Sequence, residues 1–244
     1  MSFVYNSFIF DPLYNTLIGM FTVVPWIDAG IAVMLLTIIV RLILYPLSKK
    51  AVLTQVRMQE INPKLSEIKE KYKNDSQEQA KQTLALYKET GVNPFSGVFV
   101  LIIQLPIIWA LYKIFLTAGF PGVNTEILYS FIHAPETINV IFLGLINIMN
   151  KSATLAALAA LSTFFQIKIA TSYQTLPPKD STSFSDNLAR SMQIQMKYIL
   201  PIIVFFISYN ISGVIALYWL TSNLFTIGQE LVVRRKLAAA QLVK

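Results

Sequence analysis

The chain has 244 residues, of which 55% are hydrophobic and only 14% are charged. A soluble globular domain has about 45–50% apolar and about 25% charged residues, so the composition argues against a soluble protein and predicts one membrane domain, residues 1–244. The lack of cysteine excludes disulfides, thiolate metal sites, cysteine nucleophiles and lipid attachment at cysteine. Retained basic loops and anionic lipids account for the net charge of +7, so we expect no DNA partner.

The first 26 residues contain no Lys or Arg, so they lack the basic n-region that is typical of a signal peptide. The run 3–20 is rich in aromatic residues and is broken by Asp11 and Pro12. This pattern favours a helix that lies in the membrane interface over one that crosses the bilayer. We therefore predict that residues 1–26 are a retained N-terminal interfacial segment.

Five apolar runs predict transmembrane helices, because a helix needs about 20 mainly apolar residues to cross the bilayer. They are residues 27–47, 95–116, 153–173, 193–209 and 212–233. Only Asn210 and Ile211 separate the last two runs, so these form a tight antiparallel pair. Residues 140–149 are too few to span, and we expect a re-entrant or surface segment there. The predicted fold class is an all-α polytopic membrane protein.

The distribution of basic residues predicts the orientation of these spans, because positive loops stay in the cytoplasm. Residues 117–152 hold only Lys151, and residues 1–26 hold no basic residue. Residues 48–94 hold nine basic residues: Lys49, Lys50, Arg57, Lys64, Lys69, Lys71, Lys73, Lys81 and Lys88. Basic residues also occur in the 171–192 loop and in the C-terminal segment after residue 233. The N-terminus is therefore predicted outside and the C-terminus in the cytoplasm.

Residues 48–94 carry two apolar stripes at helical spacing, which predict a cytoplasmic helical hairpin. The stripes are Ile61, Leu65, Ile68 and Tyr72, and then Ala80, Leu84 and Tyr87. Asn62-Pro63 predicts the start of the first helix. A capping box of Ser76 and Gln79 predicts the start of the second helix, and Gly91 predicts its end.

Signatures of an enzyme are almost absent from the chain. The single histidine, His133, lies in a predicted outer loop, and no acidic residue lies well inside any predicted span. The sequence therefore predicts neither a Ser-His dyad nor an intramembrane aspartyl pair. It also lacks the membrane-embedded carboxylate that ion-coupled carriers usually contain. The chain also has no Walker loop. We predict no catalytic residue, no cofactor and no metal site.

Arg41 lies in the first predicted span, six residues and about 9 Å of helix rise from its cytoplasmic end. Its side chain could simply extend to the headgroups. Other spans, however, also carry polar groups at mid-depth or towards the cytoplasm: Gln104, Thr163, Gln166, Trp219, Ser222 and Asn223. Each alone could serve helix–helix packing. Together with an arginine that has no acidic partner, they predict a water-filled, cationic cavity for a polar stretch of polypeptide.

The order of motifs resembles the YidC-type (YidC/Oxa/Alb) membrane protein insertases. The motifs are Arg41 followed by YPLSKK, then GVNPFSG, LIIQLPIIWALY and SGVIALYWLTSNLFTIGQE, within a match from about Phe8 to Lys236. This resemblance implies five core spans and a hydrophilic groove that is open to cytoplasm and lipid and sealed on the far side. It implies a chaperone-like insertase of the bacterial plasma (inner) membrane that works without nucleotide hydrolysis.

By the same resemblance, Arg41 corresponds to the groove arginine, and Gln166 and Trp219 to polar residues of the groove lining. The implied partners are nascent membrane proteins, anionic lipids and, through residues 48–94, the Sec translocon, ribosomes or targeting factors. Two alternatives stay open. One is a passive channel or small-solute permease, and the other is a non-catalytic scaffold for membrane protein assembly.

Overall fold

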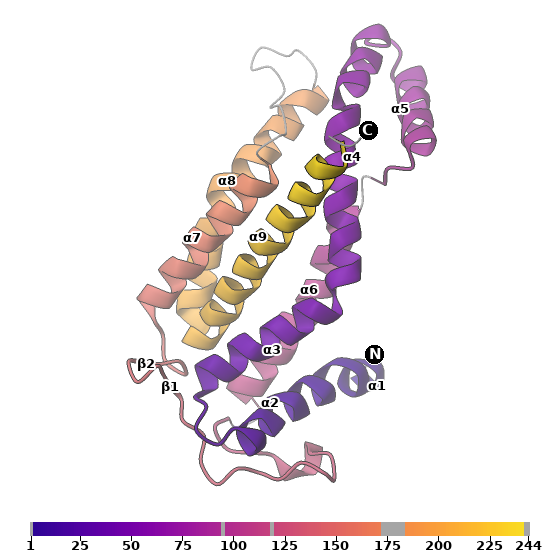
Figure 1. Cartoon of the computed structure of the whole chain (residues 1–244). Helices are drawn as coiled ribbons and strands as arrows, with labels where there is room; N and C mark the ends of the chain where they lie inside the picture. Colours follow the sequence, from indigo (N-terminus) through magenta and orange to yellow (C-terminus); the bar gives the residue numbers. More distant parts are fainter. Residues whose placement is uncertain (1, 94–95, 118–119, 172–183, 242–244) are drawn as a thin grey trace. The chain divides into compact units, whose positions relative to one another are not determined.

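A computed structural model describes residues 2–93, 96–117, 120–171 and 184–241 of the chain (Figure 1). The chain divides into two compact units, which are described separately. The first comprises Met1–Ile43 with Gln104–Gly228, and the second comprises Leu44–Ile103 with Gln229–Lys244. Most of the described residues are helical, as expected for an all-α protein.

The first unit begins with α1 (Ser2–Tyr5), a π-helical turn (Asn6–Phe10) and α2 (Asp11–Val23), which follow one another without a gap. The helix therefore continues through Asp11-Pro12, where the apolar run is interrupted. Pro12 lies in the first turn of α2, a position that proline tolerates. The π turn before it widens the backbone where the ring of Pro12 would otherwise crowd a carbonyl.

One face of α2 is covered by the loop that follows α6, through side chains that the sequence did not single out. Tyr14 and Ile18 are fully buried, and Asn15 is 1% exposed. The Asn15 amide donates to the Ile127 carbonyl (2.9 Å) and accepts from the Tyr129 amide (2.7 Å). These bonds fix the loop to α2, because a buried amide without partners would be costly.

The long helices of the first unit are α3 (Ala29–Ile43), α7 (Ala153–Ala170) and α8 (Phe184–Ile211), together with parts of α6 (Ser96–Tyr112) and α9 (Gly213–Gln241). A π-helical turn (Lys113–Thr117) extends α6. Figure 1 shows α7, α8 and α9 side by side, with α8 and α9 antiparallel. Only Ser212 separates α8 from α9, so the connection between them is as short as the sequence predicts.

Among the described residues, α7 and Arg190–Ile211 of α8 are each long and apolar enough to cross a membrane. A third candidate is made of α3 with Tyr45–Met58 of α4 (Tyr45–Lys71), and Gln104–Phe115 is a shorter apolar helix. The predicted first span is thus two helices, because Pro46 in the first turn of α4 has no N–H to continue the helix. The count of five spans and the single domain 1–244 stay predictions.

Residues 141–147, within the segment predicted to be re-entrant or at the surface, form a small β-hairpin, for which the sequence analysis assigned no strands. β1 (Ile141–Phe142) and β2 (Ile146–Asn147) pair antiparallel, with Phe142 opposite Ile146. Leu143 and Gly144 turn the chain with φ angles of 52° and 73°, a region that glycine adopts at no steric cost. The β-branched and aromatic residues beside Gly144 carried this signal, which a search for helical spans overlooks.

The second unit contains α4 (Tyr45–Lys71) and α5 (Ser76–Thr90), which lie side by side (Figure 1). Their contact is a small apolar cluster. Its buried members are Ile61, Leu86 and Val92, and Met58, Leu65, Ile68 and Tyr87 pack against them. Most of the predicted first stripe is therefore in this contact, because helical spacing places those side chains on one face.

In the second unit, the predicted start of the first helix is wrong, whereas the predicted start of the second helix at Ser76 and its end at Gly91 are confirmed, with a different capping residue at the start. α4 runs through Pro63 instead of starting there. Asp75, not Ser76, caps α5, because its carboxylate accepts from the Gln77 and Glu78 amides. Gly91 ends α5 in the left-handed region (φ 63°), as predicted.

Candidate functional site

Arg41 lies near the C-terminal end of α3 and is partly exposed. Its Nη2 donates to Gln104 Oε1 of α6 (3.0 Å) and to Ser222 Oγ of α9. Gln104 Nε2 in turn donates to the Tyr218 hydroxyl of α9. The structure thus brings three of the predicted site residues, Arg41, Gln104 and Ser222, into one hydrogen-bonded cluster in the first unit. We call this group, with Tyr218, the arginine cluster.

The arginine cluster leaves part of the guanidinium free to bind a ligand. Within the described residues, the hydrogen-bond partners of Arg41 are neutral, and no carboxylate there forms an ion pair with it. A guanidinium has five N–H groups, and in the described part of the chain only those of Nη2 find an acceptor. Because unsatisfied donors are costly away from water, the remaining ones require water or a polar ligand.

A second polar group ties α7 to α9. Asn223 Nδ2 donates to Ser162 Oγ (3.0 Å) and Thr163 Oγ1 (2.8 Å), and both hydroxyls donate to the Ala159 carbonyl. Asn223, Ser162 and Thr163 are all buried. At Thr163 and Asn223 the structure therefore favours the helix-packing alternative over an exposed position in a cavity.

Gln166 and Trp219 are partly exposed on α7 and α9, and neither forms a hydrogen bond with another described side chain. They remain accessible to a ligand. Sequence reasoning missed Tyr218 and Ser162, although both carried a signal. Tyr218 precedes the predicted site residue Ser222 by four residues, so the two share a helix face. Ser162 is the direct neighbour of Thr163, another predicted site residue.

Replacing Asn223 with alanine should loosen the packing of α7 on α9. Interhelical hydrogen bonds in membranes are worth about 0.6 kcal/mol on average and up to about 1.7 kcal/mol, so we expect a loss in this range. Unfolding of the protein in bicelles measures it. Asn210→Ala is the matched control, because the exposed Asn210 side chain bonds only to the Phe206 carbonyl of its own helix. An equal loss for both variants would contradict the assignment.

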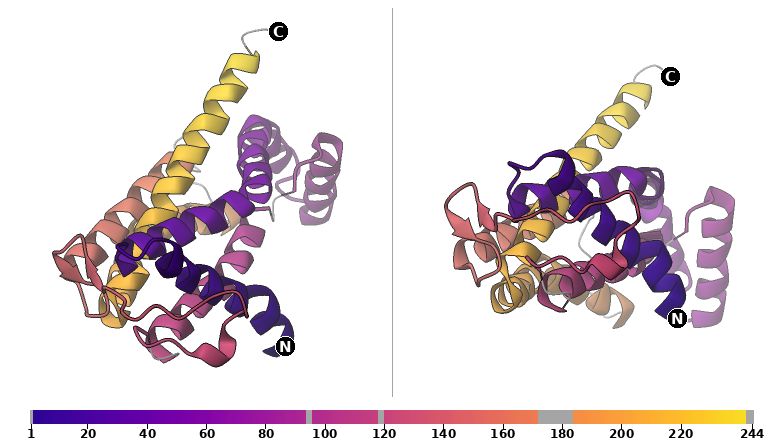
Figure 2. Two further views of the ribbon diagram at one scale, coloured as in Figure 1. Left: turned by 60° about the horizontal axis from the view of Figure 1, so that its bottom comes forward. Right: turned by 90° about the horizontal axis from the view of Figure 1, so that it is seen from below.

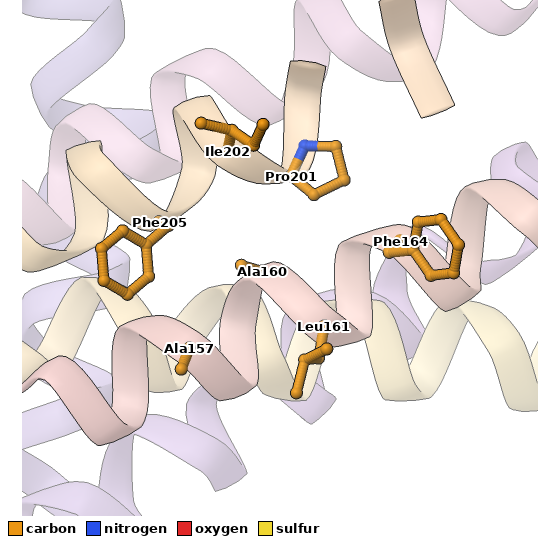
Figure 3. A pocket seen from close by; sticks show the side chains of 7 residues that line it. All are labelled: Ala157, Ala160, Leu161, Phe164, Pro201, Ile202 and Phe205. Carbon is orange, nitrogen blue, oxygen red and sulfur yellow. The ribbon is translucent and has the colours of Figure 1, made fainter. Parts of the chain in front are cut away.

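A separate recess lies between α7 and α8 (Figure 3). It has a volume of about 480 Å³ and an almost purely apolar lining. The lining residues are Ala157, Ala160, Leu161, Phe164, Pro201, Ile202 and Phe205. None of them carries a polar side chain, so the recess offers no hydrogen bond or charge to a polar substrate. The arginine cluster is therefore the stronger candidate site.

The apolar helices and the polar cluster on three of them define an all-α, multi-pass membrane protein. Residues 20–240 match the family described as 60Kd inner membrane protein. The chain belongs to this family, and the resemblance to the YidC-type proteins is thereby confirmed.

Three relatives bear the name membrane protein insertase YidC. The chain is 32% identical over 210 residues to the one from Wolinella succinogenes, 31% over 216 residues to that from Oceanobacillus iheyensis and 30% over 212 residues to that from Clostridium tetani. Each match covers 86% of this chain. The matched part is 34% of the Wolinella relative, but 76% and 84% of the other two.

Proposed function

We propose that this protein inserts newly made membrane proteins into the bacterial inner membrane and helps them fold. It does so through a hydrophilic groove that is open to cytoplasm and lipid. Five spans cross the membrane, the N-terminus is outside, the C-terminus is in the cytoplasm, and α1 and α2 lie in the outer interface. The names of the relatives support this activity. The observation that carries it is the partly exposed Arg41 with spare donors and neutral partners.

In the proposed mechanism, the hydrophilic flank of a nascent span enters the groove from the cytoplasm. Arg41 attracts acidic or other polar groups of this flank, and Gln166 and Trp219 line its path. Gln104 and Ser222 hold the guanidinium in place. Each polar group that would otherwise cross hydrocarbon unpaired costs several kcal/mol. Hydrogen bonds from the groove and its water lower this barrier.

The apolar part of the substrate supplies the driving force, so the protein needs no nucleotide hydrolysis and performs no covalent chemistry. Leu, Ile, Phe and Val each contribute about −0.3 to −0.6 kcal/mol at the centre of a span. A span of about 20 such residues therefore releases on the order of 10 kcal/mol as it moves into lipid. The groove only has to lower the barrier for the polar flank.

The α4–α5 pair serves as the cytoplasmic hairpin, residues 48–94, that receives substrates from the ribosome, targeting factors or the Sec translocon. Its support is the apolar contact between the two helices, which leaves the basic residues on the outside. Lys49, Lys50, Arg57, Lys64, Lys73, Lys81 and Lys88 are exposed. Such residues also favour anionic lipid headgroups, by about 1 kcal/mol each near the surface.

Reconstitution of the purified protein into liposomes tests the proposal. Without any nucleotide, these liposomes should protect the outer tail of a small membrane protein from protease, and protein-free liposomes should not. A solute trapped in the same liposomes should stay inside, which separates an insertase from a channel. Rapid solute loss without insertion would replace the proposal with the permease alternative. If neither insertion nor solute loss is observed, the scaffold alternative remains.

A further inference from the structure

The β-hairpin 141–147 is bonded through its backbone to the start of α3. The Ala29 amide donates to the Asn139 carbonyl (2.8 Å). The Asp28 carboxylate accepts from the Leu143 amide at the hairpin turn (3.2 Å) and from the Ile31 amide in the first turn of α3 (2.9 Å). The turn is therefore fixed to the N-terminal end of α3 by a charge-assisted bond, and the residue shortly before the hairpin by a backbone bond.

The segment that follows β2 is bonded in the same way to the start of α9. The Val214 amide donates to the Ile148 carbonyl (3.1 Å), and the Gly213 amide donates to the Asn150 carbonyl (2.9 Å). Ile148 is fully buried there. The hairpin lies beside the ends of α7 and α9 in Figures 1 and 2. Its depth is therefore set by the ends of two helices that carry the arginine cluster.

The two faces of the hairpin segment differ in burial, and both carry mainly apolar side chains. On the inner face, the Phe142 ring packs so closely on Gly30 that a methyl group there would overlap it. On the outer face, Ile141, Leu143 and Leu145 are 36%, 61% and 83% exposed. Residues 140–150 contain no charged side chain. Asn147, opposite Ile141, is the polar residue of the outer face. The tip of that face, Leu143 and Leu145, is apolar, whereas a hairpin with one face in water normally has polar residues there.

We propose that Leu143 and Leu145 insert into the outer leaflet at the boundary between headgroups and acyl chains, and anchor the hairpin there. This proposal rests on the membrane orientation given in the proposed function. Trp26, 84% exposed, lies only two residues before Asp28 and marks the same depth, because tryptophan concentrates at this boundary. The apolar tip thus continues the lipid-facing surface of the helices.

The backbone of the hairpin limits how deep the tip can go. A two-stranded sheet has two open edges whose N–H and C=O groups need water, and hydrocarbon provides none. The boundary region supplies both water for these edges and acyl chains for the leucines. This anchor holds the outer ends of α3 and α9 at a fixed depth in the membrane. These two helices carry Arg41 and Ser222.

Single-cysteine labelling tests the anchor directly, because the chain has no cysteine of its own. Leu145→Cys carries an environment-sensitive NBD label in liposomes. Thr137→Cys, an exposed polar position before the hairpin, is the matched control, and Leu161→Cys on α7 is the reference for deep lipid. Emission is recorded with lipids brominated close to the headgroup or far along the acyl chain.

The label at position 145 should emit at a shorter wavelength than the label at position 137. It should also lose more emission to the lipid brominated near the headgroup than to the deep one, whereas the label at 161 should show the reverse order. Water-like emission at 145 would overturn the proposal. So would blue-shifted emission that brominated lipid does not quench, since a protein surface would then cover the tip. The readout does not use insertion activity, so it stands apart from the proposed function.

Discussion

Arg41→Ala is expected to reduce the insertion of substrates with acidic outer tails by about 10- to 100-fold. A hydrogen bond to a charged group contributes about 1.5–3 kcal/mol, and about 1.4 kcal/mol corresponds to a factor of ten. Arg41 is the only predicted site residue with a charge, and its spare donors have no described acceptor. Insertion rates into liposomes, compared across acidic, neutral and basic tails, measure the effect.

The substitutions at this position form an ordered series. Arg41→Lys should retain most insertion activity. Compared with Arg41→Ala, Arg41→Glu should impair the insertion of substrates with acidic tails more and that of substrates with basic tails less. Lys168→Ala removes an exposed charge near the end of α7 and is the matched control. If both Arg41→Ala and Arg41→Glu inserted acidic-tailed substrates normally, the positive charge of Arg41 would have no role in insertion.

Leu86→Asp should separate α5 from α4 and abolish most insertion activity while the spans remain folded. Leu86 is 6% exposed and is a buried member of the cluster with Ile61 and Val92. Loss of a buried leucine side chain alone costs about 2–5 kcal/mol, and a buried, unpaired carboxylate adds to this cost. Hydrogen exchange of α5 measures the separation, and liposome assays measure insertion.

Leu84→Asp provides the control, because Leu84 belongs to the same helix but is 58% exposed. It introduces the same charge and should leave both hydrogen exchange and insertion close to those of the unmodified protein. If Leu86→Asp released α5 but insertion continued at the normal rate, the α4–α5 pair would not take part in the activity.

The sequence singled out three members of the arginine cluster because polar residues stand out in apolar runs. Arg41, Gln104 and Ser222 lie far apart in the chain, yet each occupies a run long enough to read as a helix. Such residues must find partners or water, which is why the structure joins them. The same logic could not say whether Thr163 and Asn223 line a cavity or bind each other, since this depends on how α7 and α9 are rotated.

The features that sequence reasoning missed or misplaced have both local and long-range causes. Pro63 reads as a helix start, but α4 continues through it, so local preference was overridden. Ser76 and Gln79 match a capping box, yet Asp75 caps the helix, and Gln79 reaches back to the Lys69 carbonyl instead. Two of the partners of Asn15, Ile127 and Tyr129, follow it by more than 100 residues, and no periodicity reveals such a contact.

Photocrosslinking to a stalled nascent membrane protein tests the central claim, that a polar site within the membrane receives the substrate. A photoreactive residue replaces Gln166 or Trp219, which are partly exposed in the first unit, and Phe131, 74% exposed in the predicted outer loop, serves as the control. The account predicts adducts with the hydrophilic flank of the nascent chain from positions 166 and 219, and none from position 131. Absence of adducts from both groove positions, or equal adducts from all three, would contradict it.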